Sequence, residues 1–195
     1  MSQHNNIFPN FTSIKNEDRA LIKKQIPMCI WMTGLSGSGK TTIANEIEKK
    51  LFLDGMHTFI IDGDNLRSGL CKDLGFSESD RDENIRRAAE LAKSLADAGL
   101  IVIVSLISPL QKHRSMARNI FMNYKFIEVF IDSPLEICEK RDIKGLYKKA
   151  RLGEIKDFTG IDSPFEPPID SDIHIKTSEL DPTECLNLIL EKIYL

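Results

Sequence analysis

The sequence predicts an α/β fold in which helices cover both faces of a mostly parallel β-sheet. Short apolar runs alternate along the chain with segments whose apolar residues have helical spacing. The run at residues 100–104 is apolar throughout, as expected for a parallel strand that is covered on both faces. A glycine-rich stretch follows the first apolar run. Together these features are typical of the α/β class.

The first half of the chain is expected to contain three strand–helix units. A short helix is expected at residues 16–24, and Pro27 separates it from the first strand. The long helix before the third strand has an apolar face, and Gly99 is expected at its C-terminal cap. The strands are predicted at residues 28–32, 57–61 and 100–104, and the helices at 40–53, 79–98 and 111–121.

The second half of the chain is expected to add two strands. The alternation of strands and helices is interrupted there by one segment. Strands are predicted at residues 126–131 and 173–176, and helices at 134–141 and from Pro182 to the C-terminus. Between them, residues 142–170 are rich in glycine and proline and carry clustered cations. We interpret this segment as a mobile basic lid with a short helix at 146–151.

Length and composition bound the possible functions. The 195 residues, of which 42% are hydrophobic, suit one domain with a real core. We expect an N-terminal arm at residues 1–26 and the domain at 27–195. The net charge of −3 does not favour nucleic acid, and no apolar run approaches the roughly 20 residues that span a bilayer. Without a visible signal peptide, and with four widely spaced cysteines, the chain is expected to be cytoplasmic.

The stretch from Gly34 to Thr41 fits the phosphate-binding pattern G-x-x-x-x-G-K-[ST] at every fixed position. Its glycines let the backbone approach phosphate oxygens, and the following helix N-terminus favours an anion. This predicts a three-layer P-loop NTPase fold of the nucleotide-kinase type, with a central five-stranded sheet. Lys40 is expected to reach the β- and γ-phosphates, and Thr41 to bind Mg²⁺. The residues assigned to ATP are Gly34, Ser36, Gly37, Ser38, Gly39, Lys40, Thr41, Thr42 and, at the start of the lid, Arg141.

Acidic residues follow the second predicted strand. Asp62 and Asp64 lie in the segment 62–65, which we expect to be a polar turn. Ligands of parallel sheets bind beyond the carboxyl ends of the strands, so these carboxylates should face the phosphate loop. A carboxylate there can hold Mg²⁺ or accept a proton from an attacking hydroxyl. At least one of these two aspartates is expected to be functional, and which of them acts as the base stays open.

Cations and isolated aromatics suggest where a second, anionic substrate binds. Arg67 and Arg81 have forked guanidinium groups that suit phosphate or sulfate. Arg81 lies in the first turn of a predicted helix, where the helix dipole disfavours a cation unless an anion is nearby. Phe76, Phe158 and Phe165 stand among polar residues and are candidates for stacking on a base.

At this point the chain resembles the adenylylsulfate kinase (APS kinase) family. The resemblance spans residues 28–177 and is carried by several stretches in family order. They are Gly34-Leu35-Ser36-Gly37-Ser38-Gly39-Lys40-Thr41-Thr42, Asp62-Gly63-Asp64-Asn65-Leu66-Arg67, Asp73-Leu74-Gly75-Phe76-Ser77, Asp80-Arg81 with Glu83-Asn84-Ile85-Arg86-Arg87, Ala96-Asp97-Ala98-Gly99, Ile107-Ser108-Pro109, Lys144-Gly145-Leu146-Tyr147-Lys148-Lys149-Ala150-Arg151 and Phe158-Thr159-Gly160-Ile161-Asp162.

The resemblance implies ATP-dependent phosphorylation of the 3′-hydroxyl of adenosine 5′-phosphosulfate, the second step of sulfate activation. It implies that Lys40, Asp62, Ser108 and Lys144 are catalytic, with Ser108 as a possible phosphoserine intermediate. It also implies that Asp62 binds the metal together with Thr41. Direct in-line transfer is the simpler route, because the sequence offers Ser108 no nearby base. The residues implied to bind adenylyl sulfate are Asp64, Asn65, Arg67, Phe76, Arg81, Asn84, Ile107, Ser108, Lys144, Phe158 and Phe165.

The resemblance also implies a homodimer and coupling to a separate ATP sulfurylase, since 195 residues leave no room for a fused one. Two alternatives are kept. One is a P-loop kinase that phosphorylates another hydroxyl acceptor, such as a sugar. The other is a non-catalytic domain that senses a nucleotide, which is disfavoured because Lys40, Thr41 and Asp62 are intact.

Overall fold

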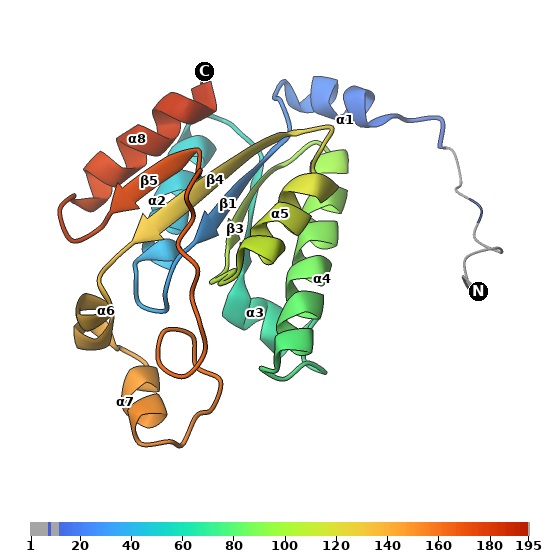
Figure 1. The fold of residues 1–195 in the computed structure, drawn as a ribbon. Coiled ribbons are helices and arrows are strands. Elements are labelled where there is room, and N and C mark those ends of the chain that lie inside the picture. The colour runs from blue at the N-terminus through green and yellow to red at the C-terminus, as the bar shows by residue number, and fades with distance from the viewer. Residues whose placement is uncertain (1–7, 9–11, 195) are drawn as a thin grey trace.

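The computed structural model describes residue 8 and residues 12–194 of the chain (Figure 1). Its centre is a five-stranded sheet in the order β2-β3-β1-β4-β5, and every neighbouring pair is parallel. The strands are β1 (Met28–Thr33), β2 (Thr58–Asp62), β3 (Ile101–Ser105), β4 (Lys125–Asp132) and β5 (Ile173–Lys176). The predicted α/β fold with five parallel strands is therefore confirmed.

Helices pack on both faces of this sheet, as Figure 1 shows. On one face, α2 and α8 contact each other, and on the other α4 and α5 do so. The helices are α1 (Asn16–Lys23), α2 (Lys40–Leu53), α3 (Gly63–Ser68), α4 (Glu78–Asp97), α5 (Gln111–Ile120), α6 (Leu135–Arg141), α7 (Leu146–Arg151) and α8 (Pro182–Tyr194).

The alternation of side chains along β1 builds two hydrophobic cores. Ile30 and Met32 point to the face that α2 and α8 cover, whereas Trp31 points to the face that α4 and α5 cover. All six residues of β1 are buried, because a central parallel strand is covered on both faces. The core thus fixes β1, and the loop that follows it, in the middle of the sheet.

The topology places the candidate site at the carboxyl end of β1. β1 lies between β3 and β4, so the chain leaves β1 toward one edge of the sheet and later continues toward the other edge. Ligands of open α/β sheets bind at such a reversal of strand order. In Figure 1, α6 and α7 lie beyond this end of the sheet, and α7 belongs to the segment 142–170. That this segment acts as a mobile lid stays a prediction.

One local prediction was wrong. Residues 62–65 do not form an isolated polar turn, because Gly63 begins helix α3 and Asp62 is its N-cap. The Asp62 carboxylate accepts a hydrogen bond of 3.0 Å from the backbone N–H of Asp64. Aspartate next to glycine is typical of turns but also of helix N-termini, and the apolar Leu66, which packs into the core, favours the helix.

The proposed division at residue 26 stays a prediction. Residues 1–7 and 9–11 of the expected arm lie outside the described residues. The rest of the arm is bonded to the domain: Asn16 donates a hydrogen bond of 2.8 Å to Asp97, and the buried Gln25 donates one of 2.8 Å to the carbonyl of Gly99. Across residues 8 and 12–194, no helix combines the length and the apolar character that crossing a bilayer requires.

Candidate active site

The phosphate loop has a backbone that only glycine accommodates at two of its positions. Gly34 has a φ of +148°, and a Cβ atom there would collide with the carbonyl oxygen of Ile131. Gly37 has a φ of +74°, and a Cβ atom would lie 3.1 Å from the carbonyl oxygen of Cys138. The loop therefore passes close to β4 and α6 and delivers its backbone N–H groups to the start of α2.

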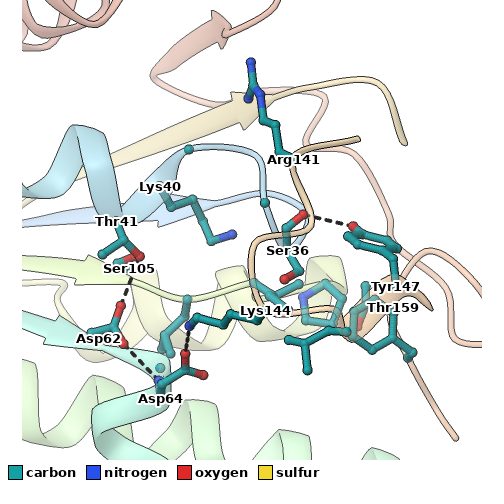
Figure 2. Close-up of a pocket in the computed structure, with 18 of the residues that line it drawn as sticks. Ser36, Lys40, Thr41, Asp62, Asp64, Ser105, Arg141, Lys144, Tyr147 and Thr159 are labelled. Atoms are coloured by element: carbon teal, nitrogen blue, oxygen red, sulfur yellow. Dashed lines mark hydrogen bonds and ion pairs between the residues drawn. The ribbon is translucent and has the colours of Figure 1, made fainter. Parts of the chain in front are cut away.

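The amine of Lys40 is held within this loop. Its Nζ donates hydrogen bonds of 2.9 Å to the carbonyl of Gly34 and 2.7 Å to that of Leu35. Burial lowers the pKa of Lys40 to about 8, because desolvation disfavours the charged amine. A phosphate placed at the loop would offset this cost by pairing with the amine. Figure 2 shows the amine pointing into the space between the loop and the lid.

Oxygen ligands gather next to the amine. The Thr41 hydroxyl donates a hydrogen bond of 3.1 Å to Asp62 and lies 3.5 Å from the hydroxyl of Ser105 (Figure 2). Because Asp62 ends β2 and Ser105 ends β3, neighbouring strands bring these groups together. Carboxylate and hydroxyl oxygens are the ligands that Mg²⁺ prefers. The chemistry of this set therefore fits a divalent cation beside the phosphate loop.

The lid reaches across the cavity to α3. The amine of Lys144 forms an ion pair with the carboxylate of Asp64, and both side chains are exposed (Figure 2). The hydrogen bond to Asp64 raises the pKa of Lys144, so the amine remains charged at neutral pH. The pair connects the start of the lid with the segment that follows β2.

Arg67, Phe76 and Arg81 form a cationic and aromatic group opposite the phosphate loop. The guanidinium carbon of Arg67 lies 4.2 Å from the centroid of the Phe76 ring, and that of Arg81 lies 5.7 Å from it. Partial burial lowers the pKa of both arginines. These two cations are therefore close together and partly desolvated, an arrangement suited to an anionic ligand.

Asn84 and Phe158 complete that side of the cavity. Asn84 is buried, and its Oδ1 atom has no hydrogen-bond partner within the described residues. A buried amide oxygen without a partner is costly, so it is positioned to accept a hydrogen bond from a ligand. The Phe158 ring meets the edge of the Tyr147 ring, with 4.9 Å between the centroids.

These groups surround one cavity of about 920 Å³. The sequence-predicted residues that line it are Ser36, Gly37, Gly39, Lys40, Thr41, Thr42, Asp62, Asp64, Arg67, Phe76, Arg81, Asn84, Ile107, Arg141, Lys144 and Phe158. The cavity lies at the upper end of the size range of small-molecule sites, and it joins the phosphate loop to the group around Phe76.

Five predicted residues lie outside the lining of this cavity. Ser38 and Asn65 are adjacent to lining residues in the chain, and Gly34 lies two positions before the lining residue Ser36. Ser108 is buried, and its hydroxyl accepts a hydrogen bond of 3.0 Å from the Trp31 indole. Phe165 packs against Phe130, with their ring centroids 6.0 Å apart. The structure therefore does not bring the side chains of Ser108 and Phe165 to the cavity.

Sequence reasoning missed two residues that hold the backbone of the phosphate loop, Tyr147 and Thr177. Tyr147 donates a hydrogen bond of 2.9 Å to the carbonyl of Ser36, and Thr177 donates one of 2.9 Å to the carbonyl of Ser38. Arg141 also donates to the Ser38 carbonyl, at 3.3 Å. Thr177 follows β5, so the rule that strand ends meet at one edge could have identified it. For Tyr147 the sequence contained no such signal beyond the family stretch around it.

The comparisons with known proteins agree with this geometry. The family model described as adenylylsulphate kinase matches residues 26–176. The adenylyl-sulfate kinase of Marinobacter nauticus is 55% identical over 177 residues, which cover 91% of this chain and 89% of the relative. The bifunctional enzyme NodQ of Rhizobium sp. strain N33 is 61% identical over 159 residues, but the match covers 82% of this chain and only 25% of NodQ.

A solved structure of an APS kinase also matches this chain. The Mycobacterium tuberculosis APS kinase CysC, in complex with AMPPNP and APS, superposes with a TM-score of 0.85 at 46% identity. The match covers 87% of this chain and 99% of that one. With the family model matching most of its length, the chain belongs to the adenylylsulphate kinase family.

Proposed function

We propose that the chain transfers the γ-phosphoryl group of ATP to the 3′-hydroxyl of adenylyl sulfate, giving 3′-phosphoadenylyl sulfate and ADP. The observation that carries this proposal is the single cavity that joins the phosphate loop to the group around Phe76. The M. tuberculosis relative, bound to AMPPNP and APS, supports a site that takes both nucleotides.

The phosphate loop is the ATP side of the proposed reaction. Its backbone N–H groups and Lys40 hold the β- and γ-phosphates, and Arg141, bonded to Ser38 and lining the cavity, approaches them from the lid. Thr41 and Asp62 would hold Mg²⁺, which when bound neutralises charge on the transferred phosphoryl group. Lys40 also neutralises this charge, because a cation out of contact with water interacts strongly with a negative charge beside it.

The opposite wall is the adenylyl sulfate side. Phe76 and Phe158 offer aromatic faces and edges to the adenine, and Arg67 and Arg81 offer cations to the phosphosulfate. The unpartnered Oδ1 of Asn84 accepts a hydrogen bond from the bound nucleotide. Asp64 and Lys144, which pair with each other in the structure, orient the ribose of adenylyl sulfate.

Transfer is direct and in line in this proposal. A loose transition state needs positioning and charge stabilisation more than covalent chemistry from the protein. Asp62 lies beside Thr41 at the boundary of the two sides and takes the proton of the 3′-hydroxyl as the new bond forms. Ser108 takes no part in a phosphoenzyme, because its hydroxyl is buried against Trp31.

We also propose that the chain acts as a cytoplasmic homodimer, supplied with adenylyl sulfate by a separate ATP sulfurylase. The free thiols of Cys29, Cys71, Cys138 and Cys185 suit a reducing compartment. Leu21, Ile22 and Ile26 expose apolar side chains around the end of α1, which supports contact with a second copy. Light scattering coupled to gel filtration tests the dimer, and a monomeric mass at micromolar concentration contradicts it.

The function is tested by mixing the purified protein with Mg-ATP and adenylyl sulfate and separating the nucleotides by chromatography. The expected result is equal formation of ADP and the 3′-phosphorylated product, dependent on adenylyl sulfate. AMP in place of adenylyl sulfate is the matched control, because it lacks the sulfate that Arg67 and Arg81 are proposed to recognise. ADP formation that is independent of adenylyl sulfate, or faster with a sugar acceptor, would refute the proposal.

A further inference from the structure

The loop at residues 107–109 has a backbone conformation that needs an explanation. Ile107 and Pro109 line the cavity, whereas Ser108 between them is buried. Ser108 has a φ of +43°, in the left-handed region that residues other than glycine rarely adopt. Such a residue keeps this conformation only where its surroundings hold it there, and it often does so beside a binding site.

Three side chains from the core hold this loop. The indole Nε1 of Trp31 donates a hydrogen bond of 3.0 Å to the hydroxyl of Ser108. The guanidinium of Arg114 donates one of 2.9 Å to the carbonyl of Ser108. The Thr33 hydroxyl donates one of 2.7 Å to the carbonyl of Ile107. The hydroxyl and carbonyl of Ser108 are thus both bonded on the side of the loop away from the cavity.

Arg114 is itself fixed by its surroundings. It is 0% exposed, and its Nε lies 3.2 Å from the carboxylate of Glu128 on β4. A second nitrogen donates a hydrogen bond of 2.7 Å to Gln111. A buried ion pair is a weak source of stability, since apolar residues can often replace it without loss. What this pair does supply is a cation held in one orientation, with a donor aimed at Ser108.

We infer that Trp31 is a positioning residue for the nucleotide acceptor. By holding Ser108 with its hydroxyl turned into the core, on a loop whose carbonyl Arg114 also bonds, Trp31 holds Ile107 and Pro109 at the cavity wall, against bound adenylyl sulfate. This inference rests on the proposed function for the identity of the ligand. It makes the hydroxyl of Ser108 an anchor for the loop and assigns it no chemical step.

The test compares Trp31→Phe, Ser108→Ala and the double variant in steady-state kinetics. Each single variant removes one end of the same hydrogen bond, so all three should raise the KM for adenylyl sulfate by a similar factor, about three- to tenfold for one neutral hydrogen bond. The KM for ATP and kcat should change by less than about twofold. The inference would be overturned if the two single-variant increases in KM multiplied in the double variant. It would also be overturned if Ser108→Ala had no turnover while Trp31→Phe stayed active.

Phe121→Leu is the matched control. Phe121 is buried in the same hydrophobic core as Trp31, with its ring centroid 5.6 Å from that of Phe126, which also packs against Trp31. This variant should lower the melting temperature and leave the KM for adenylyl sulfate unchanged. An equal rise of that KM in Phe121→Leu would show that loss of core packing, rather than the bond to Ser108, moves the loop.

A binding readout separates failure of this inference from failure of the proposed function. Trp31 is the only tryptophan of the chain, so its indole N–H gives one signal in a ¹⁵N-labelled protein. Ser108→Ala should shift this signal and weaken adenylyl sulfate binding without ATP about three- to tenfold. An unshifted signal, or unchanged affinity, would contradict the inference even in a protein that turns over. If the wild type binds adenylyl sulfate but forms no product, the proposed function fails and the loop inference is still decided.

Discussion

The hydroxyl of Tyr147 donates a hydrogen bond of 2.9 Å to the backbone carbonyl of Ser36, 111 positions earlier in the chain. Tyr147 belongs to the lid helix α7, and Ser36 belongs to the phosphate loop. The Tyr147 ring is buried and meets the Phe158 ring at 74°. One side chain of the segment 142–170 therefore contacts both the phosphate loop and Phe158 on the opposite wall of the cavity.

We expect Tyr147→Phe to loosen this closure while keeping the ring. Burial raises the pKa of Tyr147, so the hydroxyl is a donor throughout the neutral range. Loss of the hydrogen bond should raise the KM for ATP about three- to tenfold. Tyr194→Phe is the control, because that hydroxyl bonds Asp54 on the surface. Equal effects of the two variants would contradict a role for the contact between Tyr147 and Ser36.

Phe76→Ala should weaken adenylyl sulfate more than ATP. Stacking on a base contributes about 1–3 kcal/mol, so the binding free energy of adenylyl sulfate should weaken by that amount. In a calorimetric titration its dissociation constant should rise about 5- to 150-fold. Phe76 is 52% exposed, so the free energy of unfolding should change little. Phe59→Ala is matched in exposure, at 48%, and lies on β2 away from the cavity lining. Equal loss for both nucleotides would rule out the stacking role.

Asp62→Asn should separate chemistry from folding. Asparagine caps a helix as well as aspartate does, so α3 should persist and the melting temperature should stay within a few degrees. Loss of the carboxylate should lower kcat about 10²–10⁴-fold and raise the Mg²⁺ concentration needed for half-maximal rate. Asp64→Asn should instead raise the KM for adenylyl sulfate, since it loses its pair with Lys144. If Asp64→Asn lowered kcat and Asp62→Asn raised only the KM for adenylyl sulfate, the roles assigned to the two aspartates would have to be exchanged.

Lys40→Met should abolish turnover without unfolding the protein. The amine stabilises charge on the transferred phosphoryl group, so kcat should fall by at least about 10³-fold. The melting temperature at pH 7 should be retained or rise, because the buried cation is desolvated in the unliganded protein. Lys50→Met, which removes a surface ion pair with Asp54, should leave kcat unchanged. Substantial turnover in Lys40→Met would refute the assigned phosphate site.

The pKa of Lys40 also predicts a proton coupled to ATP binding. The folded pKa of about 8 lies below the ordinary value of 10.5, so between these pH values the unfolded chain binds more protons. The stability contribution of Lys40 therefore rises with pH across this window, and a bound phosphate reverses the shift. At pH 8.5, ATP binding should take up a large fraction of one proton, measured by calorimetry in buffers of different ionisation enthalpy. The uptake should vanish in Lys40→Met, and its persistence there would assign it to another group.

Much of the fold, and the part of the site around the phosphate loop, could be predicted from short runs of consecutive residues. The apolar runs at β1 and β3 indicate buried parallel strands, and the loop from Gly34 to Thr41 contains its own phosphate-binding geometry. The rule on strand ends placed Asp62 beside that loop, as the hydrogen bond to Thr41 shows. These features could be predicted because they depend on residues that are close together in the chain. The spacing of apolar side chains in strands and helices and the conformation of the glycine-rich loop are both of this kind.

The amino-acid sequence by itself determined the α/β fold and the phosphate loop. Only the tertiary structure decided which way the loop side chains point. Ser108 turns into the core because Trp31, 77 positions away in the chain, bonds its hydroxyl, and Phe165 turns away from the cavity because Phe130 stacks on it. Tyr147 meets Ser36 only once the segment 142–170 has packed against the phosphate loop. The direction of a loop side chain is set by partners that the fold brings together, so spacing along the chain does not encode it.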